Sequence, residues 1–162
     1  MNDLTLPPKV SEIINGSVEW SRIEKIDYES LGYFLSCHLV IEHYLDEYLK
    51  IEHPALDWDS ARQTFGQKVS LLSKFKISDK YDCIPAIKHM NSIRNKLSHR
   101  IDFSVQKEDL LPLIQYLEKT SDGQLETPIT IKEILGRFTS MVCVLFAGYI
   151  SSKAHYGKVD RR

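Results

Sequence analysis

The sequence has few of the residues from which disulfide frameworks, metal sites and phosphate loops are built. Its three cysteines, Cys37, Cys83 and Cys143, are widely spaced, so we expect small core residues of a protein in a reducing cytosol. Its seven glycines occur singly, which excludes a glycine-rich phosphate loop. No set of His, Cys and Asp has metal-ligand spacing, and we therefore expect no metal and no cofactor.

The chain also lacks a strong net charge and a long hydrophobic run. Its 21 basic and 22 acidic residues leave a net charge of −1, so any binding of nucleic acid needs a local basic patch. The longest apolar run, residues 141–150, is shorter than a membrane span, and residues 1–8 lack the features of a secretory signal. These absences predict a soluble, cytoplasmic protein without a membrane partner.

The chain does contain apolar residues at helical spacing nearly throughout. A hydrophobic content of 43% in 162 residues suits a single domain with its own core, and no stretch shows convincing strand alternation. The prediction is an all-α bundle of about five helices, over residues 28–50, 60–75, 83–97, 108–119 and 130–152. The expected organisation is an arm over residues 1–27, with Gly16 interrupting a short helix, a bundle over 28–156, and a flexible tail over 157–162.

Capping residues mark the expected starts of two helices. Asp59 is a good N-cap for the second helix, and Thr130 with Glu133 has the spacing of a capping box for the last helix. The last helix is apolar around most of its circumference. We therefore expect it either at the centre of the bundle or in a contact between subunits.

The hexapeptide Arg94–His99 stands at the end of the third expected helix. A guanidinium presents a planar fork of donors that suits a phosphate, and an imidazole moves protons near neutral pH. A stripe along that helix starts apolar and becomes polar, which suits a subunit interface that opens into a polar cleft. Its members are Ile84, Ile87, Asn91, Arg94 and Ser98.

An Arg followed four to six residues later by a His is not specific, because about one such match is expected by chance in a chain of this composition. A purely structural interpretation also exists. Basic side chains in a last helical turn complement the helix dipole, and a His after the helix caps its carbonyls.

The motif nevertheless resembles the signature of the HEPN superfamily. In that family an Arg is followed by a polar residue, often Asn, and a His closes the motif at the end of a bundle helix, as in residues 93–99 here. Residues 64–72 and 28–50, including the acidic Glu42, are similar to the second and first helices of the mannitol-repressor-like branch. The resemblance spans roughly residues 28–120.

This resemblance implies a homodimer in which the two motifs meet in one composite cleft. Active members are metal-independent ribonucleases, often toxins or antiphage effectors, in which the 2′-hydroxyl of the RNA attacks the adjacent phosphate. Carried onto this sequence, His99 transfers protons and Arg94 stabilises the transition state. Asn95 orients the His or binds phosphate, and Lys96 and Arg100 attract the RNA backbone.

Two features of the resemblance qualify what it implies about partners and activity. Some HEPN toxins are neutralised by modification of a Tyr two residues beyond the His, and Ile101 stands at that position. The resemblance implies a protein inhibitor or antitoxin as a partner, but neutralisation by that modification is not expected here. Mannitol-repressor-like members are described as regulators, so the alternative function is a catalytically inactive regulator or protein-interaction module.

His38 and Glu42 form a second constellation, one turn apart on the first expected helix. They align with Leu35, Leu45 and Leu49, where apolar residues are expected. In a functional interpretation the pair points at the cleft and tunes His99. In the structural one, both residues lie at the margin of the apolar face and bond to each other or to water.

Overall fold

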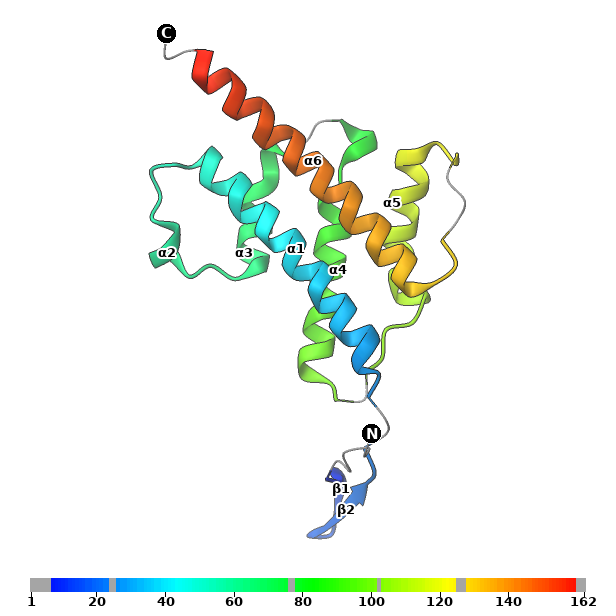
Figure 1. Ribbon diagram of the computed structural model, residues 1–162. Helices are drawn as coiled ribbons and strands as arrows, with labels where there is room; N and C mark the ends of the chain where they lie inside the picture. Colours follow the sequence, from blue (N-terminus) through cyan, green and yellow to red (C-terminus); the bar gives the residue numbers. More distant parts are fainter. Residues whose placement is uncertain (1–6, 24–25, 76–77, 102, 125–127, 160–162) are drawn as a thin grey trace.

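The structure is a computed structural model that describes residues 7–23, 26–75, 78–101, 103–124 and 128–159. It is mostly helical, with short 3₁₀ segments and one two-stranded hairpin (Figure 1). The helices are α1 (Tyr28–Glu52), α2 (Trp58–Ala61), α3 (Phe65–Ser70), α4 (Ile84–His99), α5 (Leu111–Ser121) and α6 (Ile131–Val159). The 3₁₀ segments are η1 (Leu71–Lys74), η2 (Asp79–Tyr81) and η3 (Glu108–Leu110). The strands are β1 (Lys9–Ile14) and β2 (Ser17–Ser21).

The predicted helical bundle is therefore confirmed in outline, with one helix divided. The stretch expected as a single helix over residues 60–75 consists of α2, α3 and η1. Arg62 breaks it by adopting a left-handed backbone at φ 40°, and Thr64 then starts α3 with a complete capping box to Gln67. The N-cap of α2 is Asp57 and not Asp59, which lies within that helix.

The beginning of α6 follows the sequence prediction closely. The backbone amide of Glu133 donates to Thr130 Oγ1 at 3.2 Å, and Glu133 Oε2 accepts from the Thr130 amide at 3.0 Å. This is the expected capping box. The helix continues to Val159, through part of the expected tail, and residues 160–162 lie outside the described residues.

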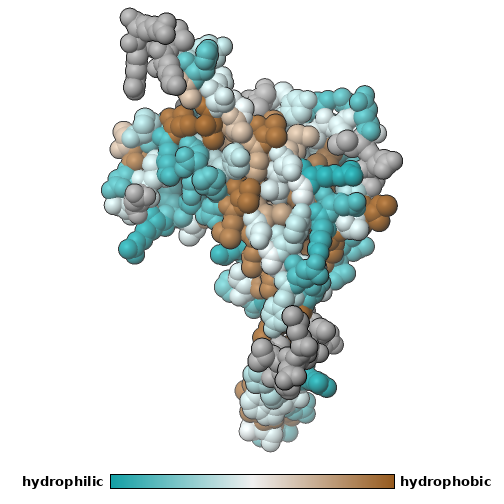
Figure 2. All heavy atoms as spheres, viewed as in Figure 1, coloured by the Kyte–Doolittle hydropathy of each residue, from teal (hydrophilic) through white to brown (hydrophobic). Residues whose placement is uncertain are grey.

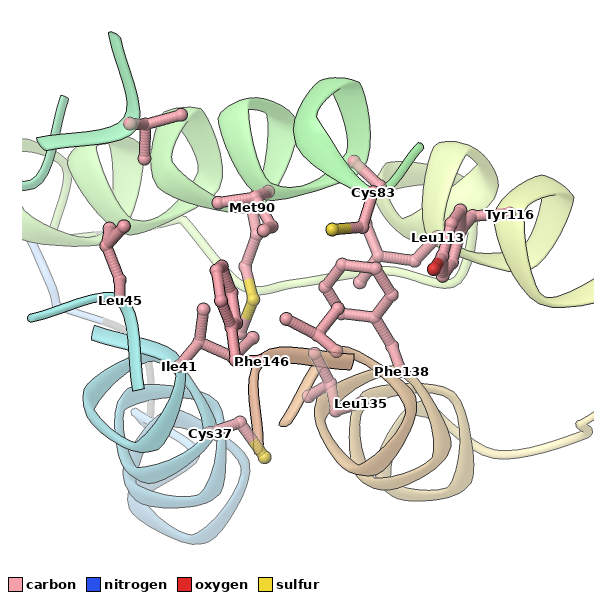
Figure 3. Packing of buried hydrophobic residues seen from close by; sticks show 14 of the residues in the cluster. Cys37, Ile41, Leu45, Cys83, Met90, Leu113, Tyr116, Leu135, Phe138 and Phe146 are labelled. Carbon is pink, nitrogen blue, oxygen red and sulfur yellow. The ribbon is translucent and has the colours of Figure 1, made fainter. Parts of the chain in front are cut away.

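Helices α1 and α6 lie side by side and run in the same direction (Figure 1). Lys132 pairs with Glu29 near their N-terminal ends, and the Tyr149 hydroxyl donates to Glu52 near the C-terminal end of α1. Helices α3, α4 and α5 pack behind them. In Figure 3, Phe138 and Phe146 extend from α6 into the space between the helices, and both side chains are fully buried.

The last helix forms one outer face of the bundle and is not surrounded by it. Residues Ile131–Tyr156 are long and apolar enough to cross a membrane by length and composition, and 33% of their most apolar window is buried inside the protein. Phe138 and Phe146 belong to the core, whereas Val144 is 66% exposed. Of the two places expected for this helix, the centre of the bundle is therefore excluded.

The N-terminal arm contains a β-hairpin, which corrects the expectation of a short helix there. β1 and β2 pair antiparallel, with Ile14 opposite Ser17. Between them Asn15 and Gly16 both have positive φ, at 51° and 79°, as the two central residues of a type I′ turn require. Asn-Gly is a strong hairpin signal, so Gly16 permits the turn and does not interrupt a helix. The fold is therefore mostly helical with one added hairpin, and not all-α as the sequence predicted.

Candidate functional site at the end of helix α4

Helix α4 packs against the core along one face, as far as Leu97, and exposes the other side of its last turns. Met90 and Ile93 are 1% and 0% exposed, respectively, whereas Arg94 and the last two residues of the helix, Ser98 and His99, are exposed. In Figure 1 the C-terminal end of α4 extends to the end of the bundle where α1 begins. The bundle therefore holds the helix rigidly and presents its motif to solvent.

Among the described residues, Arg94 does not neutralise a carboxylate. Its Nη1 lies 3.5 Å from Oδ1 of the adjacent Asn95, and no carboxylate among the described residues forms an ion pair with it. A backbone bond holds the turn, since Ser98 Oγ donates to the Arg94 carbonyl at 3.0 Å. The guanidinium is exposed, so an anion in solution can reach it.

The structure does not bring Arg94 and His99 together within one chain. His99 is the last residue of α4 and still helical. Five residues along an α-helix correspond to a rotation of about 140°, so the two side chains leave the helix in different directions. A site that uses both groups on the same phosphate needs a second chain or a ligand that reaches around the helix.

The other expected RNA-binding residues lie beside the motif. Lys96 is exposed, and its Nζ lies 5.6 Å from the centre of the Phe103 ring. Arg100 caps the helix through its backbone amide, which donates to the Lys96 carbonyl, and its side chain is exposed. Neither cation pairs with a carboxylate among the described residues. All three cations lie near the end of α4, but Lys96 is about 160° around the helix from Arg94, so they do not share one face.

His38 lies buried on the side of α4 that carries Arg94. It is 3% exposed, its ring centroid is 4.2 Å from that of Phe65, and its Nε2 has no hydrogen-bond partner. Burial is the main cause that lowers its pKa below the usual 6.5. The charge of Glu42 opposes this shift, the positive charge of Arg94 adds to it, and the Asn91 side chain opposes it. The structure therefore associates His38 with Arg94 and Asn91, and not with His99.

Glu42 has a partner that sequence reasoning did not assign. Lys68 of α3 donates to Glu42 Oε1 at 2.9 Å and lies 2.8 Å from Asp46 Oδ1, one turn farther along α1. Burial alone lowers the pKa of Lys68, but its bonds to Asp46 and Glu42 outweigh this effect and raise the pKa overall. Glu42 thus ties α3 to α1 and lies next to His38 rather than at the motif.

The stripe from Ile84 to Ser98 is only partly a free surface. Ile87 is 1% exposed and belongs to the core of its own chain, so the apolar end of the stripe is covered without a second subunit. Asn91 faces α3, because a Cβ added to Gly66 would lie 3.6 Å from Asn91 Nδ2. Asn91 precedes Arg94 by three positions, so its place on the same face of the helix follows from the sequence. Its contact with α3 does not.

The described residues offer neither a metal centre nor an activated thiol. They contain no group of three or more His, Cys, Asp or Glu side chains that could hold a metal ion. Burial raises the pKa of the Cys83 thiol to about 12 and that of Cys143 to about 11, so both remain protonated at neutral pH. At the end of α4, Arg94, His99 and Asn95 place a guanidinium, an imidazole and an amide on exposed positions.

Comparison of the chain with models of known families, with curated proteins and with solved structures gave no match in any of the three.

Proposed function

We propose that this protein is a metal-independent endoribonuclease that acts as a homodimer, with its site at the free ends of two α4 helices. The observation that carries the proposal is the exposure of Arg94 and His99 on a rigidly held helix, with no acidic partner for Arg94 among the described residues. A guanidinium without a carboxylate partner suits an external phosphate. The resemblance of residues 93–99 to the HEPN signature supports the same assignment.

The divergence of the two side chains supports a site that two copies share. Since Arg94 and His99 are about 140° apart on one helix, we propose that Arg94 of one copy works with the partner's His99. Two-fold symmetry then produces two equivalent sites from one interface. Lys96 and Arg100 would hold the flanking phosphates, and the attraction would depend on salt concentration.

The proposed reaction is an internal transesterification of RNA. A neutral imidazole accepts the proton of a ribose 2′-hydroxyl, and the 2′-oxygen attacks the adjacent phosphorus. The bond from phosphorus to the 5′-oxygen breaks, and the same imidazole, now an imidazolium, returns the proton to that leaving oxygen. Arg94 stabilises the charge that accumulates on the phosphoryl oxygens. The products carry a 2′,3′-cyclic phosphate and a 5′-hydroxyl.

A catalytically inactive regulator is the second candidate, and one observation favours it. Arg94 lies in line with Asn91 and near the buried His38, so its position also suits a polar contact with a protein partner at the junction of α1, α3 and α4. Such a regulator would have the same fold and form the same dimer but would not cleave RNA.

We propose the enzyme as a cytoplasmic toxin or defence nuclease, with a protein inhibitor as its expected partner.

Purified protein incubated with total RNA in excess chelator tests the proposal. We expect cleavage that leaves cyclic phosphate ends, with a loss of about 100-fold or more in Arg94→Ala and in His99→Ala. Lys88→Ala, on an exposed position of the same helix, and His155→Ala, on an exposed position of α6, are the matched controls. Absence of cleavage by the wild type, or equal cleavage by all four variants, would reject the nuclease.

Mixing the two inactive variants tests whether the site is shared between copies. If Arg94 works with the partner's His99, a heterodimer of Arg94→Ala and His99→Ala retains one intact site. Random pairing then restores about a quarter of the wild-type activity. If both residues act within one chain, the mixture remains inactive.

A further inference from the structure

The N-terminal hairpin has one continuous apolar face. Val10 pairs with Trp20 and Ile13 pairs with Val18, and the register is shifted between Val10 and Glu12. In a regular strand residues 10 and 13 point to opposite faces. The extra residue of the irregularity restores their alignment, so that the two apolar pairs share one face.

Nothing in the described part of the chain covers this face. Val10 is 50% exposed, Ile13 66%, Val18 42% and Trp20 62%, and the hairpin projects beyond the end of the bundle (Figure 1). An isolated two-stranded hairpin is marginally stable in water, and it gains stability when its apolar face is packed. The hairpin is therefore amphipathic, and packing of its apolar face against another surface would stabilise it.

The bundle has a second unpartnered apolar surface, in a groove between α1 and the first half of α6. The groove has a volume of about 760 Å³ and is lined mainly by apolar atoms, including those of Leu117 on α5 and of Met141 and Val144 on α6. The charged residues Lys132, Glu133 and Arg137 also line it. The Tyr33 hydroxyl lies over Gly136, 2.8 Å from the position that a Cβ would take there, and Val144 is 66% exposed. Figure 2 shows hydrophobic side chains gathered over α1 and α6.

We propose that the β1–β2 hairpin of one copy packs its apolar face into the α1–α6 groove of a second copy, and that the exchange is reciprocal. One symmetric dimer then covers both unpartnered surfaces of each chain. Because both surfaces belong to the same chain, the second copy supplies the complementary surface in each direction, as in exchange of an element between protomers. The interface is closed, so the assembly stops at two copies.

The area that such an exchange buries favours a second copy acting in both directions. The four apolar side chains of the hairpin face are between 42% and 66% exposed, which leaves roughly 300 Å² of apolar surface to cover. One contact therefore buries on the order of 600 Å², counted on both sides. This is less than the roughly 1,200 Å² at the lower limit of stable specific interfaces. Two reciprocal contacts reach that limit, whereas one hairpin in one groove does not.

The proposed exchange also fits the end of the molecule where the motif lies. The hairpin leaves the bundle at the end where α1 begins and α4 ends, and the groove opens along the first turns of α6 at the same end (Figure 1). Reciprocal packing therefore brings like ends of the two bundles toward each other. The inference goes beyond the proposed nuclease activity and does not depend on it, since it concerns apolar surfaces away from Arg94 and His99.

Trp20 provides a direct probe, because the chain has only two tryptophans. Trp58 is half-buried and donates from Nε1 to the His53 carbonyl at 3.1 Å. The variant Trp58→Phe leaves Trp20 as the single emitter. We expect its emission to shift to shorter wavelength as concentration rises, in parallel with the change from monomer to dimer mass measured by sedimentation.

Two substitutions in the Trp58→Phe background locate the contact. Val144→Arg places a charge in the groove, and we expect it to weaken dimerisation at least tenfold and to abolish the emission shift. Leu111→Arg is the matched control, because Leu111 is 50% exposed on α5 and is not among the groove residues. The control is expected to behave like its parent.

Each other outcome rejects the proposal in an identifiable way. A monomer at all concentrations with solvent-exposed Trp20 means that the hairpin has no partner copy. A monomer with buried Trp20 means that the hairpin lies on its own bundle. A dimer that persists in Val144→Arg with exposed Trp20 means that copies pair through another surface.

The RNA assay separates this inference from the proposed function. A dimer that follows the expected emission behaviour but does not cut RNA rejects the nuclease and keeps the hairpin exchange. Cleavage by a protein that fails the emission test does the reverse. Arg94→Ala is expected to leave the emission shift and the dimer mass unchanged, because Arg94 does not line the groove.

Discussion

Large apolar and charged side chains are buried or paired in the bundle, whereas in two other parts of the chain they are exposed. These two parts, called the free parts, are the hairpin and the last turns of α4. In the bundle Phe138 is fully buried, and Lys68 is paired with two carboxylates. In the free parts Trp20 is 62% exposed, and Arg94 has no carboxylate partner among the described residues. The contacts that stabilise the bundle lie within the bundle itself. The exposed side chains of the free parts are therefore not needed for its stability, and a second molecule can contact them.

The largest effect is expected at the centre of the bundle. Phe138→Ala removes a fully buried ring that lies 5.7 Å, centroid to centroid, from that of Tyr116. Loss of this burial and the resulting cavity should lower the free energy of unfolding by about 3–5 kcal/mol. Chemical denaturation measures the change. Ile129→Ala, at a position 78% exposed, is the control, and an equal loss in both variants would contradict the described core.

A smaller effect is expected where α3 is joined to α1. Lys68→Met keeps the apolar part of the side chain and removes the ammonium that bonds to Glu42 and Asp46. The two partly buried carboxylates then repel each other, and we expect a loss of about 1–3 kcal/mol in the free energy of unfolding. Lys50→Met, at a more exposed lysine of α1, should cost less than about 1 kcal/mol.

The pH dependence of Lys68 has the opposite sign to that of a buried carboxylate. Its pKa is raised in the folded protein, so its contribution to stability is complete below the ordinary lysine pKa. That contribution is lost as the pH rises above this value. The difference in unfolding free energy between wild type and Lys68→Met should therefore shrink at strongly alkaline pH. A difference that grows there would contradict the pairing.

His38 should make the bundle less stable in mild acid. Its pKa is lowered on folding, mainly by burial, so the unfolded chain takes up a proton first as the pH falls below about 6.5. In that window the unfolded state binds more protons, and unfolding free energy falls by at most about 1.4 kcal/mol per pH unit. His38→Met should lack this slope. His43→Met, at an exposed position of α1, should retain it.

The smallest effects on the bundle are expected in its free parts. Arg94→Ala should leave the free energy of unfolding within about 0.5 kcal/mol of the wild type, because the side chain is exposed and pairs with no described carboxylate. A small gain is also consistent with a functional residue. Measurements at low protein concentration exclude a contribution from the proposed dimer. A loss of several kcal/mol would assign Arg94 to the fold and remove the main support for the nuclease.

Sequence reasoning located the helices well and the hairpin not at all. The capping box of Thr130 and Glu133 is a local pattern that requires only a few residues, and it was found. The hairpin carries an equally local Asn-Gly signal, but its strands do not alternate regularly, because the irregularity near Val10 displaces one residue. A strict period of two therefore hides the strand, and the turn was the better guide.

The candidate site could be found only in part. Arg94 and His99 follow from their chemistry and spacing, but their divergence around the helix depends on how far α4 continues, and α4 includes His99. The association of Glu42 with Lys68 joins residues 26 positions apart, so no local pattern predicts it. His38 was singled out as a polar residue on an apolar face, and only packing against Phe65 shows that it is buried.

The sequence by itself determined the helical periodicity, the capped start of α6 and the motif at the end of α4, because each depends on neighbours within a few residues. Only the tertiary structure decided which apolar surfaces are covered. It placed α6 on the outside of the bundle and left Trp20 and Val144 exposed. Burial is a property of segments distant in sequence, since an apolar face is satisfied only by whatever packs against it.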